Sequence, residues 1–236
     1  MTTQTVKVGI CGLGTVGRGV IALLFEGGDV LSNRVGGSIE LVHVATRTPK
    51  PEVDTLGARD SRDVFDVARD PNVDVLIELI GGTTVAKELV VEALNQGKHV
   101  VTANKALLAD HGDELFTLAE STGVALRFEA AVAGGIPVIE AVKTSLAGNH
   151  VSSVAGIING TSNFILTEMA AKGREFSDVL AEAQALGYAE ADPTFDVDGT
   201  DAAQKLVLLA SLAFGARIDP DAPVSYTHLR AHETHP

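Results

Sequence analysis

The sequence predicts an α/β protein whose N-terminal part is built on a parallel β-sheet, with a smaller α+β region after it. Three observations support this prediction. Short β-branched apolar runs alternate with helical patterns up to residue 128, a glycine cluster directly follows the first run, and helical patterns prevail beyond residue 134. Strands that alternate with helices are typical of βαβ units, whose buried parallel strands are continuously apolar.

The first part of the chain contains alternating strand and helix patterns. Gly97 ends one of the helices, because glycine adopts the left-handed conformation that a helix C-cap favours. We expect these elements to form one domain, 1–134. Apolar runs predict strands at 6–11, 39–45, 73–80, 99–102 and 124–128, and apolar periodicity predicts helices at 16–25, 85–95 and 105–120.

The second part, 135–222, is expected to be a separate, mostly helical domain. Its pattern predicts a helix at 136–145 with Pro137 in the first turn, a strand at 151–158, and helices at 163–172, 178–186 and 200–214.

The last segment, 223–236, does not continue this pattern. It has no helical or strand period and holds three of the seven histidines. A histidine-rich tract can bind metal. The segment nevertheless resembles the read-through end of a truncated reading frame, so we leave it out of the functional argument.

Composition and charge exclude several classes of protein. Lys and Arg number 18 and Asp and Glu 31, and the net charge of −13 argues against binding to nucleic acid or an anionic membrane. Cys11 is the one cysteine, which excludes an intramolecular disulfide and a cysteine-based zinc cluster. No uncharged apolar stretch reaches about 18 residues, and no basic segment precedes the first apolar run. We therefore expect a cytoplasmic protein.

A dinucleotide-binding motif follows the first predicted strand and opens the first predicted helix. Gly12 permits a tight turn, Gly14 lets the backbone approach a pyrophosphate, and Gly17 lets helix and strand pack closely. The free N–H groups of the helix N-terminus attract phosphate. The motif predicts a Rossmann domain whose cofactor-binding residues are Gly12, Leu13, Gly14, Thr15, Val16 and Gly17.

The end of the second predicted strand bears on the choice between NAD and NADP. Many NAD-binding domains place an acidic residue there for the ribose 2′-hydroxyl. This sequence has Arg47 instead, whose guanidinium suits a 2′-phosphate. We expect NADP as the cofactor, and NAD stays possible. An apparent insertion at 27–37 explains the long spacing between the glycines and Arg47.

Thr102 and Lys105 lie where the fourth predicted strand gives way to a helix. Ligands of open α/β sheets bind at the carboxyl ends of the strands. A lysine is unfavourable at the positive end of the helix dipole, which suggests a functional reason for its position. We expect both residues to contact the cofactor, and Lys105 to orient a polar substrate group or stabilise negative charge near the nicotinamide.

Five carboxylates and one lysine fall within 190–205. Part of this segment resembles a calcium-binding loop, but Lys205 stands where a bidentate Glu is required. Asp201 and Lys205 are four residues apart on a predicted helix and share a face. An exposed ion pair of this kind contributes little to stability. Because the helix that follows is strongly apolar, we expect Lys205 at a desolvated domain edge.

Four segments resemble the homoserine dehydrogenase family. They are 102–105, 129–137, 159–163 and 183–205, and the likeness extends from the first strand to about residue 222. The resemblance implies a Rossmann dinucleotide-binding domain followed by a partial α+β catalytic and dimerisation domain. It implies NAD(P)-dependent interconversion of L-homoserine and L-aspartate 4-semialdehyde, on the route to threonine, methionine and isoleucine.

The resemblance also implies site residues. Lys205 is the general acid and base at the substrate oxygen, and Lys105 assists it. Glu190 and Asp201 hold the ammonium and hydroxyl groups of the substrate, and Asp196 supports the lysines. The backbone at Gly160 and Thr161 faces the substrate.

By the same resemblance, a monovalent cation, typically sodium, binds to backbone carbonyls. The resemblance also implies a homodimer for the full-length enzyme, whose family members continue well beyond residue 222. The carbonyls that would hold the cation belong to Glu129, Val132, Gly134 and Ile136.

Two alternatives stay open. Another Rossmann reductase of a small polar substrate could also place a lysine after a strand, although it would lack the block 190–205. An incomplete chain could bind NADP without dehydrogenase activity.

Overall fold

The computed structural model describes residues 4–224. The chain divides into two compact units, Met1–Ile136 and Pro137–Pro236, and each is described by itself. The predicted segment 223–236 lies outside the described residues from residue 225 on. No helix within residues 4–224 is long and apolar enough to cross a membrane.

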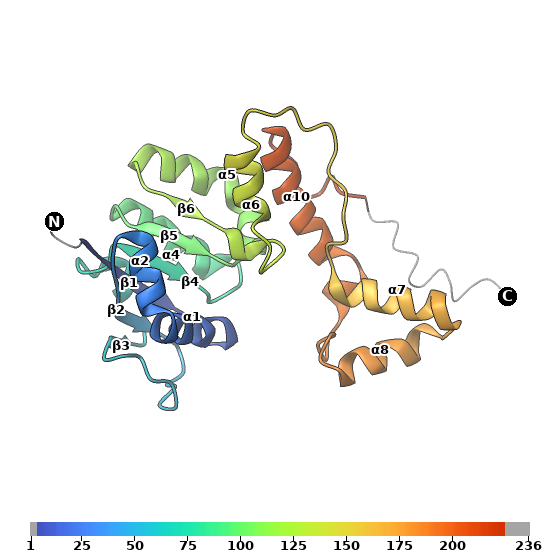
Figure 1. Cartoon of the computed structure of the whole chain (residues 1–236), viewed down its shortest axis with the longest axis horizontal. Helices are drawn as coiled ribbons and strands as arrows, with labels where there is room; N and C mark the ends of the chain where they lie inside the picture. The colour runs from blue at the N-terminus through green and yellow to red at the C-terminus, as the bar shows by residue number, and fades with distance from the viewer. Residues whose placement is uncertain (1–3, 225–236) are drawn as a thin grey trace. The chain divides into compact units, whose positions relative to one another are not determined.

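A six-stranded, wholly parallel sheet forms the centre of the first unit (Figure 1). The strand order is β3-β2-β1-β4-β5-β6, so the order reverses between β1 and β4. This is the Rossmann arrangement, which binds dinucleotides in the crevice at the reversal. The predicted α/β fold is therefore confirmed. The strands are β1 (Gln4–Cys11), β2 (Gly37–Ala45), β3 (Arg59–Ser61), β4 (Val75–Glu78), β5 (His99–Thr102) and β6 (Leu126–Arg127).

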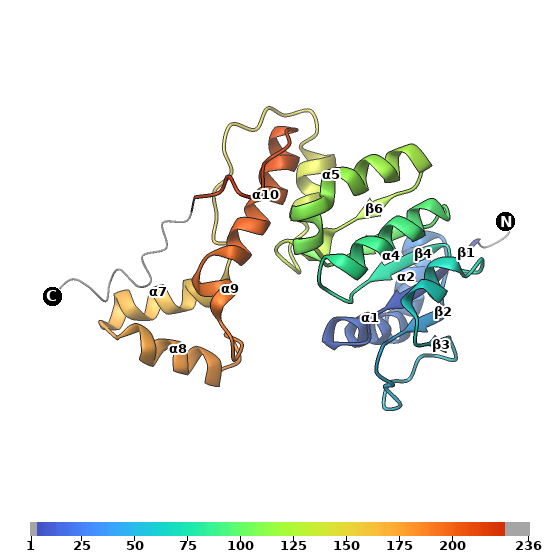
Figure 2. The ribbon, with the colours of Figure 1, turned by 180° about the vertical axis from the view of Figure 1, so that it is seen from behind.

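Five helices connect these strands and cover both faces of the sheet (Figures 1 and 2). Along one face α3 packs against α4 and α4 against α5. The predicted strand and helix patterns of this part are all present, with ends that differ by a few residues. The helices are α1 (Thr15–Glu26), α2 (Gly28–Val35), α3 (Val64–Arg69), α4 (Thr84–Asn95) and α5 (Lys105–Thr122).

The short elements that the sequence did not predict are α2, β3, α3, η1 (Glu129–Ala131) and α9 (Thr194–Val197). No residue of α2 is buried, so the helix has no apolar stripe that a periodic pattern could reveal. The three residues of β3 are polar and pair only with the end of β2. The segment 27–37, expected as an insertion, contains α2, which has Gly27 as its N-cap residue and Gly36 as its C-cap residue.

The core of the first unit consists of aliphatic side chains from the strands and from the inner faces of the helices. Its largest fully buried apolar side chains are Ile10, Leu76, Leu89, Leu94, Leu107 and Leu115. Burial of each such side chain stabilises the fold by about 1.5–3 kcal/mol.

The glycine turn between β1 and α1 is closely packed. Gly12 has φ +104°, and a Cβ atom there would lie 2.5 Å from the carbonyl oxygen of Leu79. A Cβ atom at Gly17 would collide with the carbonyl oxygen of Gly12. Larger side chains at these two positions are therefore excluded by backbone atoms, which cannot move aside as a flexible side chain can.

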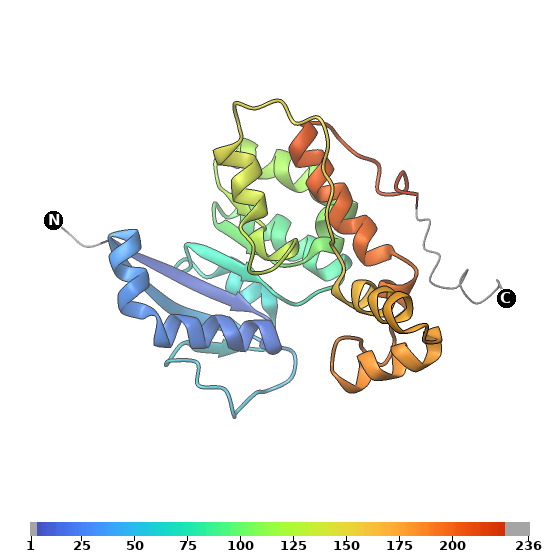
Figure 3. The same cartoon turned by 45° about the vertical axis from the view of Figure 1, so that its right-hand side comes forward.

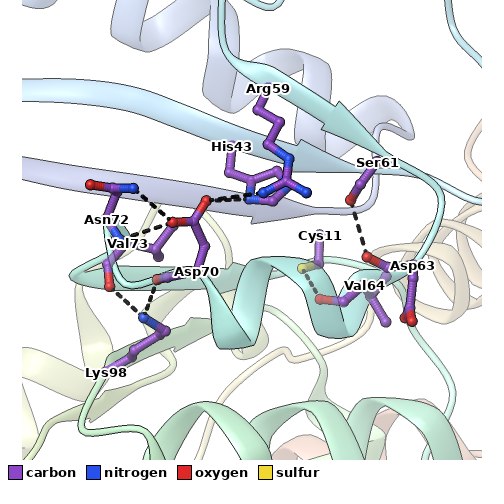
Figure 4. A network of polar contacts seen from close by, with 10 residues as sticks. All are labelled: Cys11, His43, Arg59, Ser61, Asp63, Val64, Asp70, Asn72, Val73 and Lys98. Carbon is purple, nitrogen blue, oxygen red and sulfur yellow. Dashed lines mark hydrogen bonds and ion pairs between the residues drawn. The ribbon is translucent and has the colours of Figure 1, made fainter.

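A buried polar network joins β2 to the turn before β4 (Figure 4). His43 is fully buried, and its Nδ1 lies 2.8 Å from Oδ2 of Asp70. Lys98 Nζ donates to the carbonyl oxygens of Asp70 and Val73 at 2.6 and 2.8 Å. Burial raises the pKa of the nearby Cys11 thiol, so this cysteine is not a reactive thiolate.

The second unit, within its described residues, is helical. Figure 3 shows α7 and α8 (orange) side by side, and they pack around Ile165 and Val179. Asn159 caps α7, which explains why this helix starts before the predicted residue 163. The elements are α6 (Val138–Glu140), the π-helical turn η2 (Ala141–Ser145), α7 (Gly160–Lys172), α8 (Phe176–Ala185), α9 (Thr194–Val197) and α10 (Thr200–Phe214).

The predicted strand at 151–158 is wrong. This segment has no regular secondary structure, and most of it is exposed, with Ile157 at 78%. A strand needs a neighbour for its backbone N–H and C=O groups, and no described residue of the second unit pairs with this segment. The predicted helix at 136–145 starts later, at Val138, because Pro137 is its N-cap residue.

The crowding at Gly17 predicts a difference between two glycines of α1. Gly17→Ala forces a Cβ atom against the Gly12 carbonyl and should lower the free energy of unfolding by about 1–3 kcal/mol. Gly19→Ala is the control, because nothing lies within 4 Å of its Cβ position. Alanine there should be neutral or stabilise by about 0.5–1 kcal/mol. Urea denaturation followed by circular dichroism measures both, and equal effects would contradict this account of the turn.

The Asp70 network predicts how stability depends on pH. Burial raises the pKa of the Asp70 carboxyl, but hydrogen bonds from the Asn72 backbone and the His43 ring outweigh this, and the pKa falls below its usual value. The stabilisation is complete above the unfolded pKa of about 3.9. It is lost as pH falls through the lower pKa of the folded state.

Asp70→Asn should therefore be less stable than the wild type near neutral pH and should lose less of its stability on acidification. Urea denaturation at a series of pH values below about 6 tests this around the carboxyl pKa range. Asp110→Asn, an exposed change on α5, is the control. If the free energy of unfolding falls equally with pH in the wild type and in Asp70→Asn, the Asp70 carboxylate does not contribute to the pH dependence of stability.

Candidate functional site

The glycine turn leaves the N-terminus of α1 open to a ligand. Gly14 is the N-cap residue, no side chain bonds to the cap, and nothing lies within 4 Å of its Cβ position. Thr15 and Val16 are exposed, whereas the Leu13 side chain is buried, so only the backbone of Leu13 can face a nucleotide. The free N–H groups and the absent Cβ fit the pyrophosphate of a dinucleotide.

Arg47 lies exposed just beyond the carboxyl end of β2. A second arginine nearby, Arg62, binds Asp60 with two nitrogens at 2.9 and 2.6 Å and also donates to the Thr46 carbonyl oxygen. Because Asp60 balances the charge of Arg62, Arg47 is the better candidate for a 2′-phosphate.

A network of hydrogen bonds shapes the turn that carries Lys105. Thr102 is buried, and its hydroxyl donates to Oε2 of Glu78 at 2.5 Å. The Asn104 backbone N–H donates to the Thr102 hydroxyl at 2.9 Å, and Asn104 Oδ1 caps α5 by accepting from the Leu107 N–H. Lys105, half-buried, is the first residue of α5, at the carboxyl edge of the sheet. Glu78 and Asn104 were not among the predicted site residues.

The second unit has a cavity of about 510 Å³. It brings together the predicted catalytic Lys205 and four of the five predicted substrate-binding residues, which come from α7, α9 and α10. Asn159, Phe164 and Tyr188 also contribute, and the rings of the latter two are 5.1 Å apart. The lining residues are Asn159, Gly160, Thr161, Asn163, Phe164, Thr167, Tyr188, Asp196, Asp201 and Lys205.

Lys205 forms an ion pair at the wall of this cavity. Its Nζ lies 2.6 Å from Oδ2 of Asp201 and 3.0 Å from the Ile158 carbonyl oxygen. Asp201 is buried and Lys205 is half-buried, so water screens this pair less than an exposed one. The two acceptors hold the ammonium group in a defined position.

Asn159 connects the two carboxylates of the cavity. Its Nδ2 donates to Asp196 Oδ1 at 2.7 Å and to Asp201 Oδ2 at 2.9 Å. Its Oδ1 accepts from the Ser162 N–H at 2.7 Å and caps α7. The sequence signal was an asparagine directly before a helix, but the pattern alone did not show the contacts with residues more than 30 positions away.

Glu190 is not among the residues that line the cavity. It is exposed, and its backbone carbonyl accepts from Gln184 Nε2 at 3.0 Å. The nearby Asp192 carboxyl has a lowered pKa, because the hydroxyl and N–H of Thr194 both donate to it. In the described structure, Glu190 therefore does not line the cavity together with Asp201 and Lys205.

The four residues predicted to hold a monovalent cation lie in one loop at the end of the first unit. Glu129 belongs to the short helix η1 (Glu129–Ala131), Val132 is buried, and Gly134 and Ile136 are exposed. Their proposed ligands are backbone carbonyls, which suit a hard cation. Among the described residues no cluster of three or more His, Cys, Asp or Glu side chains could hold a metal.

Two sequence families match the chain. The family described as "Homoserine dehydrogenase, NAD binding domain" matches residues 12–129, and the family described as "Homoserine dehydrogenase" matches residues 137–233. Curated homoserine dehydrogenases of Pseudomonas aeruginosa and Neisseria gonorrhoeae are 59% and 52% identical to the chain over 92% and 90% of its length. The alignments cover 50% and 49% of those relatives, so the chain spans about half their length.

Solved structures agree with the sequence comparison. The crystal structure of a homoserine dehydrogenase from Thiobacillus denitrificans matches with a TM-score of 0.88 and 49% identity, over 93% of this chain and 51% of that one. A hyperthermophilic archaeal homoserine dehydrogenase in complex with NADPH matches with a TM-score of 0.79 and 26% identity, over 91% of this chain and 71% of that one.

The geometry of Asn159 predicts that it stabilises the cavity. Asn159→Ala removes the cap of α7 and the donor to two carboxylates, and should lower the free energy of unfolding by about 2–4 kcal/mol. Asn159→Asp keeps the capping oxygen but places a third carboxylate beside Asp196 and Asp201. It should also destabilise at neutral pH, and the effect should shrink in acid.

Urea denaturation of the two variants measures these effects. Asn149→Ala, an exposed change in the same unit, is the control and should stay within about 0.5 kcal/mol of the wild type. Wild-type stability in both Asn159 variants would show that the contacts with Asp196 and Asp201 contribute nothing.

Proposed function

The chain belongs to the homoserine dehydrogenase family, and on this premise we propose that it interconverts L-homoserine and L-aspartate 4-semialdehyde with NADP(H). The observation that carries the proposal is the Lys205–Asp201 pair in the wall of a cavity lined by further polar groups. A small amino-acid substrate needs a proton donor and acceptor at its oxygen and carboxylates for its ammonium group. The cavity residues provide both kinds of group.

The first unit would hold the nucleotide. The backbone of the residues 12–17 would bind the pyrophosphate, Arg47 would bind the 2′-phosphate, and Thr102 and Lys105 would lie toward the nicotinamide end. A nicotinamide bound there would supply hydride transfer to or from the carbon that is an alcohol in homoserine and an aldehyde in L-aspartate 4-semialdehyde. NADP is proposed over NAD because an arginine, not a carboxylate, follows β2.

Lys205 would move the proton. When the aldehyde is reduced its oxygen gains negative charge, which the Lys205 ammonium can stabilise before it donates a proton to that oxygen. In the reverse direction the neutral amine accepts the proton of the hydroxyl. Asp201 and the Ile158 carbonyl would orient Nζ, and Asn159 would keep Asp201 in place. Lys105 is proposed as a second lysine that assists at the substrate.

The carboxylates would select the substrate. Asp201 would bind its ammonium or hydroxyl group, Asp196 would support the lysines, and the backbone at Gly160 and Thr161 would face the substrate. Glu190 is proposed as a further ligand of the ammonium group, although it does not line the described cavity.

Three further features complete the proposal. The carbonyls of the loop 129–136 would bind sodium, the full-length protein would be a homodimer, and the activity would serve threonine, methionine and isoleucine biosynthesis in the cytoplasm. A second candidate function follows from the length of the chain. Because it spans about half of its curated relatives, it could bind NADP without oxidising homoserine.

Two variants test the proposal on the 236-residue chain. Gly14→Ala keeps a negative φ and meets no neighbouring atom, so the variant should fold, at a cost of about 1 kcal/mol because alanine is a poorer N-cap residue than glycine. Its Cβ should obstruct the pyrophosphate and weaken NADPH binding at least about tenfold. Lys205→Ala should keep NADPH binding and lower the rate of homoserine oxidation at least about 100-fold.

NADPH fluorescence titration measures binding, and NADPH absorbance measures homoserine oxidation. Lys172→Ala, an exposed lysine on α7, is the control for Lys205 and should leave both unchanged. Unchanged turnover in Lys205→Ala would refute its role as acid and base. A wild-type chain that binds NADPH but does not oxidise homoserine would favour the second candidate function.

A further inference from the structure

We infer that Glu78 is a positioning residue for the nicotinamide half of the cofactor, because its buried carboxylate connects the turn that carries Lys105 to the loop after β4. The inference rests on the proposed NADP binding. Glu78 is the last residue of β4 and is fully buried. It is paired with Cys11 of β1 on one side and Thr102 of β5 on the other, so it lies beside the point where the strand order reverses.

Both oxygens of the Glu78 carboxylate are engaged. Oε1 accepts from the backbone N–H groups of Ile80 and Gly81 at 2.9 and 3.2 Å. Oε2 accepts from the Thr102 hydroxyl at 2.5 Å. The loop that begins at residue 79 is thereby folded back toward the end of β4, and the same carboxylate binds the end of β5.

A second contact holds the other end of the loop 79–82. Asn104 Nδ2 donates to the Gly82 carbonyl oxygen at 2.6 Å, and the Asn104 N–H donates to the Thr102 hydroxyl. Gly81 and Gly82 both have φ +71°, a conformation that favours glycine. The loop 79–82 is therefore held at both ends by the residues that shape the Lys105 turn.

The loop also touches the dinucleotide motif. The Gly12 turn lies so close to Leu79 that a Cβ atom at Gly12 would contact its carbonyl carbon and oxygen. The Leu79 N–H donates to the Cys11 carbonyl oxygen at 2.8 Å. Glu78 thus sets the position of the segment between the glycine turn and the Lys105 turn, on the β4–β6 side of the crevice.

The hydrogen bonds of Glu78 indicate that it positions the two loops and does not only fill space in the core. The donors to Glu78 named above are all neutral, and burial of a carboxylate without a cation carries a desolvation penalty. An apolar residue would fill the same volume without that penalty. What the carboxylate adds is several acceptor sites that hold two loops in one geometry. In a Rossmann domain the β4–β6 half receives the second mononucleotide, here the nicotinamide half.

The experiment compares two ligands on the 236-residue chain. NADPH has the nicotinamide half, and 2′-phospho-ADP-ribose lacks the nicotinamide ring but keeps the pyrophosphate and 2′-phosphate. Glu78→Ala should weaken NADPH binding about tenfold or more. Glu78→Gln has the same size but cannot accept at both ends, and should weaken it about fivefold. Both variants should bind 2′-phospho-ADP-ribose within about twofold of the wild type, since its sites lie on the glycine turn and near β2.

Calorimetric titration measures both ligands, and circular dichroism confirms that the variants fold. Glu88→Gln, an exposed change on α4, is the matched control and should alter neither affinity. If Glu78→Ala fails to fold, the isosteric Glu78→Gln decides the question.

The outcomes are distinguishable. NADPH affinity equal to wild type in Glu78→Gln, or an equal loss for both ligands in a folded variant, would overturn the positioning role alone. A wild-type chain that binds neither ligand would overturn the proposed function and, with it, this inference.

Discussion

The contact between the Gly12 turn and the loop after β4 is the constraint on which the nucleotide-binding unit depends. Backbone meets backbone there without an intervening side chain. The approach fixes how closely β1 and β4 can end beside each other, at the reversal of strand order. Because a phosphate-binding turn works through its N–H groups, the same absence of Cβ atoms that allows the packing also leaves room for a ligand at Gly14.

In each unit, one asparagine both caps a helix and binds a segment that is distant in the sequence. Asn104 caps α5 and binds the Gly82 carbonyl, and Asn159 caps α7 and binds Asp196 and Asp201. Each uses its oxygen to start a helix and its NH₂ group to hold a distant segment. The lysine next to Asn104, and the lysine paired with Asp201, are thereby placed by the same kind of side chain. In both units a helix N-terminus and a candidate lysine site share one asparagine.

The fold could be predicted because its signals are local. Continuous apolar runs, helical periodicity and the spacing of three glycines can each be recognised within a few residues. The six-stranded parallel sheet confirms the α/β fold that these signals predict. Elements without an apolar stripe, such as α2, escaped the analysis. The segment 151–158 was wrongly predicted as a strand because its β-branched composition says nothing about whether a pairing partner is present. In the cavity, Asp201 and Lys205 could be expected together because they are four residues apart on one helix.

The sequence by itself determined the α/β class, the dinucleotide turn and the family, since these depend on residue types at short spacings. Only the tertiary structure decided that Asn159 bridges Asp196 and Asp201, that Glu78 connects the ends of β4 and β5, and that Glu190 does not line the cavity. Hydrogen bonds to buried carboxylates depend on the position of each donor within a few tenths of an ångström. That position results from the packing of whole elements, which no local pattern contains.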